Sequence, residues 1–447
     1  MFTFANRHFS LSTTLTIGFV AVILLGALLL TLPIATVKGI ESSFVIALFT
    51  STSATCVTGL TLVETGTYWS FFGQFVIMML SEIGGLGFMT FMVLMFTTSR
   101  RKLRLSTQLL AQESLNLQHL SQIKLVRLIV GLSLGIQGGG AVLLFCDFLP
   151  KYGFWRGLWY SVFHAVSAFC NAGFSLFDES VSIFKHDTYL LFVLGIMILC
   201  GSVGFLVWRD LLTYHKRHTL SLHTKLSLRT GAIIFIASLI LYTLTERGFN
   251  SIDPDATIFQ KFSNILFMAV TPRTAGLITF DYGHLSMAGI FLTMMLMFIG
   301  GTPGSTAGGV KSTTIGLLAV QTWATLRGRH DVNFSNRRFP RENIYRALTL
   351  IIVAFSIITI ATFVLCMTQP LNKEMGLEYI IFEVLAAFGT TGISLGLTAH
   401  LTLVGKIVIM LMMFIGRVGI FDVMYTVLNA KNHQDDFRYP EEGVLIG

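Results

Sequence analysis

The sequence predicts an all-α polytopic membrane protein, in which four helix, pore loop, helix repeats surround one central pore. Three observations lead to this fold class: long apolar stretches, Lys and Arg concentrated in alternate connections, and four half-length apolar segments that each end in a glycine. Of the 447 residues, 53% are hydrophobic and only 12% are charged, and the mean hydropathy is +0.73. A soluble core cannot bury that much apolar surface, so we expect a lipid bilayer around the chain.

Eight apolar stretches are long enough for a membrane helix, which needs about 20 residues to cross a hydrocarbon core of about 30 Å. The first, residues 14–34, exceeds the apolar region of a cleaved signal peptide, about 7 to 15 residues, so we expect it to remain as a helix. The sixth, 286–326, is interrupted by glycines. The other six are 70–96, 128–148, 188–208, 230–246, 347–368 and 402–428.

The distribution of basic residues predicts that both termini face the cytoplasm. With the N-terminus inside, 20 of the 31 Lys and Arg residues lie in cytoplasmic segments, and eight lie outside or near the outer helix ends. The remaining three lie within membrane segments. This bias follows the positive-inside rule and accounts for the net charge of +8. No nucleic-acid partner is therefore expected.

Four outer connections each contain about 12 helical residues, then a small or polar break, then one glycine. These segments are 42–63, 157–177, 256–280 and 376–398. Their glycines are Gly59, Gly173, Gly276 and Gly392. The separations of 114, 103 and 116 residues indicate an internal repeat. The predicted units are repeat 1 (1–105), repeat 2 (106–220), repeat 3 (221–335), repeat 4 (336–430) and a cytoplasmic tail (431–447).

A helix too short to span the bilayer must end inside it. Irregular backbone at that depth survives only where protein or a water-filled cavity satisfies its polar groups, so four such segments predict a shared pore. Each glycine can adopt φ > 0 without a steric penalty and direct carbonyl groups inward. A ring of carbonyls can replace the hydration shell of an ion, and the C-terminal ends of the short helices would favour a cation.

The four loops resemble those of the Trk/Ktr/HKT superfamily of potassium transporters, most closely the KtrB-type or TrkH-type membrane subunits. The resemblance covers essentially the whole chain. The motifs that carry it are Thr55-Cys56-Val57-Thr58-Gly59-Leu60, Asn171-Ala172-Gly173-Phe174, Thr271-Pro272-Arg273-Thr274-Ala275-Gly276 and Gly389-Thr390-Thr391-Gly392.

The resemblance implies a K⁺ filter with one signature glycine per repeat, in which carbonyls of the glycine and the residues just before it hold the ion. Family members with serine in the first loop tend to favour Na⁺, so Gly59 favours K⁺. The implied K⁺ ligands are Val57, Thr58 and Gly59; Asn171, Ala172 and Gly173; Thr274, Ala275 and Gly276; and Thr390, Thr391 and Gly392.

The glycine-rich interruption of the third repeat is expected to lie inside the pore, where it could obstruct ion flow. The resemblance likewise implies an intramembrane gating loop, and a broken helix that merely lines a cavity is the alternative. A nucleotide-binding P-loop is not expected, because Val310 separates the second glycine from the lysine and no strand precedes the segment. The predicted gate residues are Gly300, Gly301, Gly304, Ser305, Thr306, Ala307, Gly308, Gly309, Lys311 and, from the last span, Arg417.

Arg417 lies in the middle of the last apolar span, where a lipid-facing charge is costly. It is therefore expected to face the ion pathway or a carboxylate. As a pore-facing cation it would form an electrostatic barrier below the filter, and the resemblance supports that role. The alternative is a structural arginine neutralised by Glu82, Glu383 or Asp422.

Four other ionisable residues lie in the predicted membrane region. Arg273, in the third filter segment, is expected to turn behind the loop and donate hydrogen bonds to backbone carbonyls. Glu82 and Glu383 either hold filter loops in place or attract cations, and the sequence does not separate these roles. His164, in the second pore helix, is expected to be a packed core residue.

No paired catalytic carboxylates, nucleophile motif or metal-ligand cluster indicates an enzyme. The expected function is K⁺ uptake, with Na⁺ dependence left open. The alternatives are a less selective Na⁺/K⁺ pathway and a proton- or sodium-coupled carrier of another substrate, which would be built from paired inverted halves. The resemblance also implies the bacterial inner membrane, a homodimer and a cytosolic nucleotide-binding KTN/RCK partner. Basic segments near 100–104, 215–229 and 327–346 would then be docking surfaces, or they reflect topology alone.

Overall fold

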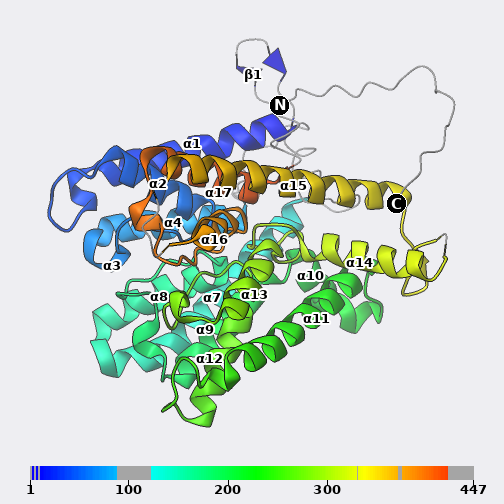
Figure 1. Ribbon diagram of the computed structural model, residues 1–447. Helices are drawn as coiled ribbons and strands as arrows, with labels where there is room; N and C mark the ends of the chain where they lie inside the picture. Colours follow the sequence, from blue (N-terminus) through cyan, green and yellow to red (C-terminus); the bar gives the residue numbers. More distant parts are fainter. Residues whose placement is uncertain are drawn as a thin grey trace.

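The computed structural model is a helical protein (Figure 1), and the order of its elements repeats one arrangement of helices four times. The structure describes residues 3–4, 7–8, 11–87, 122–329, 331–370 and 375–420. In these ranges, the sheet content is limited to two hairpins of two-residue strands. β1 (Thr3–Phe4) pairs with β2 (Arg7–His8), and β3 (Asn333–Phe334) pairs with β4 (Arg337–Arg338). The predicted all-α fold class is confirmed.

Each unit consists of a long outer helix, a pore helix and an inner helix. The outer helices are α1 (Leu11–Thr31), α7 (Gln122–Tyr152), α11 (Leu222–Thr245) and α15 (Arg341–Thr368). The pore helices are α2 (Phe44–Thr55), α8 (Phe154–Cys170), α12 (Ile258–Val270) and α16 (Leu377–Phe388). The inner helices are α4 (Phe71–Leu86), α9 (Thr188–Ser202), α13 (Met287–Phe298) and α17 (Leu403–Val418).

Shorter elements connect these helices. They are α3 (Thr65–Tyr68), α10 (Phe205–Arg217) and α14 (Ser312–Leu326), together with the 3-10 turns η1 (Pro33–Ala35), η2 (Ser182–Phe184), η3 (Arg247–Phe249), η4 (Tyr282–His284) and η5 (Thr398–His400). The order of helices along the chain agrees with four repeats, and the exact repeat boundaries stay a prediction.

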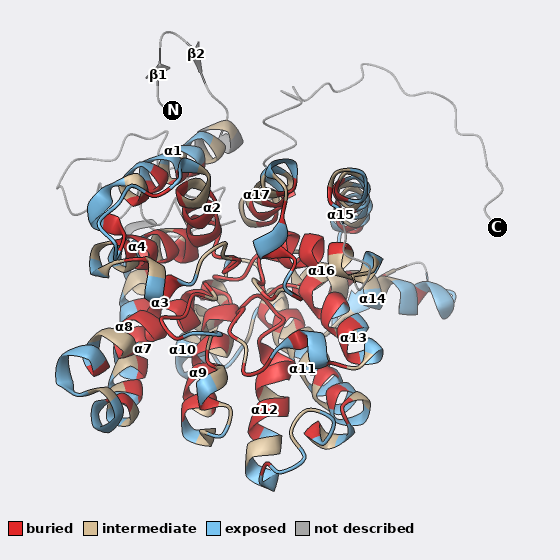
Figure 2. Ribbon diagram, turned by 60° about the vertical axis from the view of Figure 1, so that its left-hand side comes forward, coloured by how far each residue is buried: buried red, intermediate tan, exposed pale blue. Residues whose placement is uncertain are grey.

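Burial separates the outer helices from the pore helices. On α15, the side chains of Ile352, Phe355 and Phe363 are 64–67% exposed, which suits contact with lipid rather than water. In contrast, Ser53 and Thr55 at the end of α2 are fully buried. Figure 2 shows buried residues gathered toward the centre of the molecule and exposed ones on its outer helices. The outer helices therefore present an apolar surface to the surroundings, as a multi-pass membrane protein requires.

Several described helices are long and apolar enough to cross a bilayer. α11, α15 and residues Val126–Tyr152 of α7 each meet this condition alone, and α9 with α10 forms a bent span. The two helices of that pair meet at 94° across a break at Val203 and Gly204. The prediction of one continuous helix over 188–208 was therefore wrong, because hydropathy alone does not detect a bend that depends on tertiary contacts.

The inner helices are shorter than the predicted spans. α4, α9, α13 and α17 contain 16, 15, 12 and 16 residues, which correspond to about 18–24 Å at 1.5 Å per residue. The predicted spans 70–96 and 402–428 continue into residues 88–96 and 421–428, which lie outside the described residues. So do the basic segment 100–104, Asp422 and the predicted tail 431–447.

Glycines allow three inner helices to approach the ends of the pore helices. A Cβ built on Gly84, Gly201 or Gly416 would lie only 1.9–2.0 Å from a backbone carbonyl oxygen. Those oxygens belong to the pore helix of the same unit, at Thr55, Phe169 and Phe388. Small residues permit this close backbone packing in membrane proteins, and here it fixes the depth at which α2, α8 and α16 end.

Candidate ion filter and gate

The four predicted filter segments share one backbone conformation. Each signature glycine has positive φ: 89° at Gly59, 73° at Gly173, 74° at Gly276 and 80° at Gly392. The residue two positions earlier also has positive φ in every loop, although it is not glycine. These residues are Val57 (57°), Asn171 (58°), Thr274 (89°) and Thr390 (50°).

Such repeated left-handed conformations are rare for residues with side chains and mark functional sites. In each loop, the residue between these two positions does not have positive φ. In an extended chain of uniform handedness, successive carbonyls point to opposite sides. Alternating handedness allows them to point to the same side, so each loop can offer a row of carbonyl oxygens to one ion path.

The four glycines form a closed ring. A Cβ built on Gly59 would lie 2.7 Å from the carbonyl oxygen of Ala172. A Cβ on Gly173 would lie 3.1 Å from the carbonyl oxygen of Ala275. A Cβ on Gly276 would lie 2.3 Å from the carbonyl oxygen of Thr391, and a Cβ on Gly392 would lie 2.1 Å from the carbonyl oxygen of Thr58. Each glycine thus abuts the residue just before the glycine of the next unit, and the fourth unit returns to the first. The sequence order of the units is also their order around the ring.

Hydroxyl groups from the pore helices hold the filter loops. The Gly59 N–H donates to Ser53 Oγ at 3.0 Å, and Ser167 Oγ donates to the Phe174 carbonyl at 2.6 Å. In the third unit, Thr271 Oγ1 donates to the Leu277 carbonyl at 2.6 Å. Sequence analysis did not identify Ser53 and Ser167, because a Ser within an apolar helix carries no distinctive signal until its partner is known. It named Thr271, which follows α12, only as part of the third filter motif.

A cavity of about 880 Å³ lies above the ring, and all four filter glycines line it. Its wall carries the carboxylates of Glu64, Glu179 and Asp281 and the amine of Lys185. The acidic excess favours cations over anions at this mouth. The structure therefore brings the predicted filter segments together beneath one polar vestibule.

The predicted gate residues lie directly against the filter. Thr306 Oγ1 donates to the Phe169 carbonyl at 3.1 Å and accepts from Asn171 Nδ2 at 2.9 Å. A Cβ built on Gly308 would lie 2.1 Å from Thr390 Oγ1. The loop between α13 and α14 therefore touches the second and fourth filter segments. The contact through Asn171 could not be predicted, because 135 residues separate it from Thr306.

Backbone and lysine contacts close the gate loop on itself. Its two ends pair where the Gly300 N–H donates to the Val310 carbonyl at 2.8 Å and the Ser312 N–H to the Gly301 carbonyl at 3.0 Å. Lys311 Nζ donates to the Ala307 carbonyl at 2.6 Å. The remaining predicted gate residues, Gly304, Ser305 and Gly309, lie in the same loop, whose Gly309 N–H donates to the Gly416 carbonyl at 3.2 Å.

Arg417 binds backbone carbonyls and joins the gate loop to another unit. Its Nη1 donates to the Thr306 carbonyl, and its Nη2 donates to the carbonyls of Gly84 and Gly85 near the end of α4. Within the described part of the chain, neither Glu82 nor Glu383 pairs with it, so neutralisation by these two carboxylates was a wrong alternative. Asp422 lies outside the described residues.

The other buried ionisable residues have defined surroundings. Glu82 Oε2 accepts from Gln137 Nε2 at 2.7 Å, which ties α4 to α7. Arg273 is 6% exposed, and its Nε has no hydrogen-bond partner among the described residues, so the predicted bonds to loop carbonyls are not observed. His164 is fully buried and stacks on Phe177 with ring centroids 4.7 Å apart, which confirms a packed histidine.

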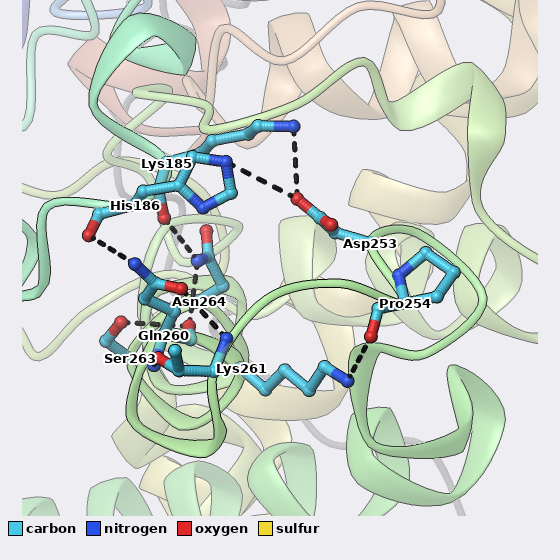
Figure 3. Close-up of polar contacts among 9 residues, drawn as sticks. Lys185, His186, Asp253, Pro254, Gln260, Lys261, Ser263 and Asn264 are labelled. Atoms are coloured by element: carbon cyan, nitrogen blue, oxygen red, sulfur yellow. Dashed lines mark hydrogen bonds and ion pairs between the residues drawn. The ribbon is translucent and has the colours of Figure 1, made fainter.

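Polar contacts connect the second and third units on the vestibule side (Figure 3). Lys185 Nζ lies 3.1 Å from Asp253 Oδ2, and His186 Nε2 lies 3.7 Å from the same oxygen. The Lys185 carbonyl accepts from Asn264 Nδ2 of α12 at 2.7 Å. The hydrogen bond from Lys185 lowers the pKa of the Asp253 carboxyl below its ordinary value. We call Lys185, His186, Asp253 and Asn264 the outer staple.

Comparison with known proteins identifies the family. A family model described as TrkH, cation transport protein, matches residues 12–438. The chain is 45% identical over 432 residues to the potassium/sodium uptake protein NtpJ of Enterococcus hirae, covering 96% of each chain. It is 39% identical over 443 residues to the Ktr system potassium uptake protein B of Bacillus subtilis, covering 98% of this chain and 97% of the relative.

A solved structure supports the fold. The potassium transporter TrkH from Vibrio parahaemolyticus matches with a TM-score of 0.72 and 18% identity, covering 95% of this chain and 86% of that one. The matched family and these relatives are transporters, in agreement with the prediction that the chain is not an enzyme. This protein therefore belongs to the TrkH family of cation transport proteins.

Proposed function

We propose that this protein carries K⁺ into the cell across the plasma membrane, through a pseudo-fourfold filter formed by the four glycine loops. The observation that carries the proposal is the closed ring, in which every glycine abuts a carbonyl oxygen of the next unit. Twelve residues supply the carbonyls: those of the four signature glycines and of the two residues before each. Alternating φ signs along each loop allow these oxygens to face one axis and replace the water of a dehydrated cation.

K⁺ is the preferred ion in this proposal. Support comes from glycine, rather than serine, at position 59 and from the names of two relatives, a potassium/sodium uptake protein and a potassium uptake protein. The first name also keeps a dependence on Na⁺, or a less selective Na⁺/K⁺ pathway, as an alternative. A proton- or sodium-coupled carrier of another substrate gains no support from four units arranged in one ring.

The gate loop and Arg417 form the proposed barrier below the filter. The loop from Gly300 to Lys311 contacts two filter segments, and Arg417 fastens it to α4. Its guanidinium adds a positive charge to a cation pathway. Opening would require these hydrogen bonds to break, because the loop cannot leave the filter while Arg417 holds Thr306.

The assembly that we propose follows the family resemblance. Two copies would form a homodimer in a bacterial inner membrane with both termini in the cytoplasm, and a cytosolic nucleotide-binding KTN/RCK partner would control the gate. The basic residues near 215–229 and 327–346 offer positive surfaces for such a partner, and α14 links the second of these segments directly to the gate loop.

The test is rescue of a K⁺-uptake-deficient bacterium at limiting K⁺, with and without a partner subunit. We expect the intact chain to restore growth and Gly59→Ser and Gly392→Ser to lose K⁺ preference, because a Cβ at either position meets a filter carbonyl within 2.7 Å. Gly39→Ser is the matched control: Gly39 also has positive φ (66°), but its Cβ would meet nothing within 4 Å. Rescue that is indifferent to both filter glycines would favour the carrier alternative.

A further inference from the structure

The pore helices share a register relative to the filter glycines. The residue nine positions before each glycine is Thr50, His164, Phe267 or Glu383 in the four units. In the second and fourth units this residue bonds the serine two positions after the glycine. Glu383 Oε2 accepts from Ser394 Oγ at 2.8 Å, and His164 Nε2 lies 3.1 Å from Ser175 Oγ. In these two units, different polar side chains at the same position of the pore helix thus bond the corresponding serine.

The contacts of Glu383 are those of a carboxylate that accepts on both oxygens. The side chain is fully buried. Its Oε1 accepts from Thr398 Oγ1, while the Ser394 hydroxyl that donates to Oε2 itself accepts from the Gly396 N–H at 3.0 Å. In the segment after the fourth filter glycine, this carboxyl group therefore holds the hydroxyls of Ser394 and Thr398 directly and the Gly396 N–H through Ser394.

His164 makes the corresponding contacts in the second unit. Its Nδ1 lies 2.7 Å from the Tyr160 carbonyl, which can only accept, so Nδ1 carries the proton. Nε2 then accepts from the Leu176 N–H at 3.3 Å. The imidazole is neutral in this arrangement, and it holds the backbone just after the second filter glycine.

The other two units lack this support. Phe267 has no polar group, and Thr50 Oγ1 is buried without a hydrogen-bond partner among the described residues. Because the ring order is that of the sequence, the second and fourth units face each other across the pore. One diagonal of the filter is therefore braced by the residue nine positions before its glycine. The other diagonal has only the hydroxyls of Ser53 and Thr271, which bond the Gly59 N–H and the Leu277 carbonyl.

We propose that Glu383 is a positioning residue that sets the ion preference of the filter, by holding the segment Ser394–Thr398 and with it the fourth filter loop. The inference rests on the proposed function. Hydrogen bonds to a carboxylate are stronger and shorter than neutral ones, and a ring that discriminates ions must resist closing around a smaller one. Loss of the brace lets the fourth loop move inward, which favours Na⁺ relative to K⁺. Glu383 itself touches no ion.

The experiment is a double-mutant cycle read by uptake. Intact protein, Glu383→Gln, Ser394→Ala and the double variant are compared for the KM for K⁺ and for inhibition of K⁺ (or Rb⁺) uptake by Na⁺. We expect each single variant to increase inhibition by Na⁺ about tenfold, the factor that corresponds to one charged hydrogen bond. The double variant should be no worse than the worse single one, because Glu383→Gln weakens the bond that Ser394→Ala removes.

Glu378→Gln is the matched control, since Glu378 lies in the first turn of the same helix α16 and its loss removes the same charge without touching the filter segment. If Glu378→Gln changes Na⁺ inhibition as much as Glu383→Gln, the effect is one of charge, and the proposal is wrong. Additive effects in the cycle, or unchanged Na⁺ inhibition in membranes that contain normal amounts of both single variants, also overturn it. Ser394→Ala keeps the buried carboxyl and tests the brace if Glu383→Gln does not accumulate.

These outcomes separate the brace from the filter itself. If the intact chain takes up no K⁺ or Rb⁺, the proposed function fails, and the brace fails with it. If the intact chain takes up K⁺ selectively and the Glu383 and Ser394 variants do the same, the filter stands and only the brace is refuted.

Discussion

Arg417 is the residue whose role the structure changes most. Hydropathy predicts that a charge at its position faces the ion pathway or a carboxylate. The structure instead offers three backbone carbonyls, from Thr306, Gly84 and Gly85. An arginine suits this site because its planar fork presents several donors in fixed directions. Arg417 is thus both a positive charge below the filter and a latch between α17, α4 and the gate loop.

Replacing Arg417 by glutamine should speed K⁺ uptake severalfold, because it removes the charge and the three-way hydrogen bonding that hold the loop beneath the filter. Initial rates of Rb⁺ uptake in cells with matched protein levels measure the effect. The uptake rate of Arg417→Lys should lie between those of the intact protein and Arg417→Gln. The lysine ammonium keeps the charge but cannot reproduce the bidentate geometry of the guanidinium. Slower uptake with a low yield of Arg417→Gln would indicate a purely structural arginine.

At this scale, the sequence predicted the residues that share a repeated pattern. The four glycines were identifiable because each follows a half-length helix at near-equal spacing. The partners of Arg417 and Asn171 were not, because the contacts join residues 111 to 333 positions apart. The positive φ of Val57 and Thr274 was equally hidden, since valine and threonine do not ordinarily adopt it.

Among the structural elements, the gate loop has the clearest functional consequence. It interrupts an apolar stretch that would otherwise form one helix from α13 to α14. Asn171 and Arg417 of other units hold it, in addition to its own backbone pairing and Lys311. Its predicted position inside the molecule agrees with the burial of Thr306 and Ala307, which are 0% and 1% exposed. The loop is therefore a separate element that can be shortened without removing a filter residue.

Deletion of Ser305, Thr306 and Ala307 should raise ion flux and make it independent of any cytosolic partner. The deletion removes the bonds of Thr306 to Phe169, Asn171 and Arg417. Flux into vesicles that contain the purified chain alone measures the effect, and substitution of the same three residues by Gly-Gly-Gly controls for loop length. Unchanged flux after the deletion would contradict a gating role.

The outer staple gives an element-scale prediction for pH. Because Lys185 lowers the pKa of Asp253 in the folded protein, the pair contributes stability above the unfolded pKa of this carboxyl. That stability is lost as pH falls through the lower folded pKa. We expect Asp253→Asn to lower the thermal unfolding temperature slightly at neutral pH, since the Lys185 side chain is 43% exposed and ion pairs open to water contribute little.

At strongly acidic pH, the intact protein and Asp253→Asn should have nearly identical unfolding temperatures. Asp253 is then protonated in both the folded and the unfolded intact protein, so its charge no longer contributes. Lys185→Met serves as the partner variant and should show the same convergence. A difference between Asp253→Asn and the intact protein that persists unchanged in acid would rule out the charge pair as its source.

The elements themselves were largely predictable, and their ends were not. Half-length pore helices followed from apolar runs bounded by small residues. α2, α12 and α16 have 12, 13 and 12 residues, as predicted, whereas α8 has 17 and is longer than predicted. The bend between α9 and α10 was missed, because residues 188–208 are apolar throughout and the cause lies in tertiary contacts. There the Phe205 N–H donates to the Gly304 carbonyl at 2.8 Å, so the gate loop of one unit takes over the hydrogen bonding at the break of another.

At the scale of the whole molecule, the ring of loops requires that all four pore helices enter from the same side. The vestibule with Glu64, Glu179 and Asp281 marks that side, and the basic hairpin with Arg337 and Arg338 belongs to a connection at the opposite helix ends, between α14 and α15. The positive-inside rule predicts that the hairpin lies in the cytoplasm. We therefore expect the vestibule to face the outside, as uptake through an acidic, cation-attracting mouth would need.

Labelling of single cysteines tests this orientation. Glu179→Cys in the vestibule should react with a membrane-impermeant cationic thiol reagent added to intact cells, whereas Arg337→Cys should react only after the cells are opened. The reagent should also stop Rb⁺ uptake by Glu179→Cys, because a bulky positive group would sit in the cavity above the filter glycines and repel cations. Uptake by Arg337→Cys should be unaffected in intact cells. If Arg337→Cys is labelled from outside and Glu179→Cys is not, the topology is the reverse of the one predicted. If Glu179→Cys is labelled but Rb⁺ uptake continues, the ion path lies elsewhere.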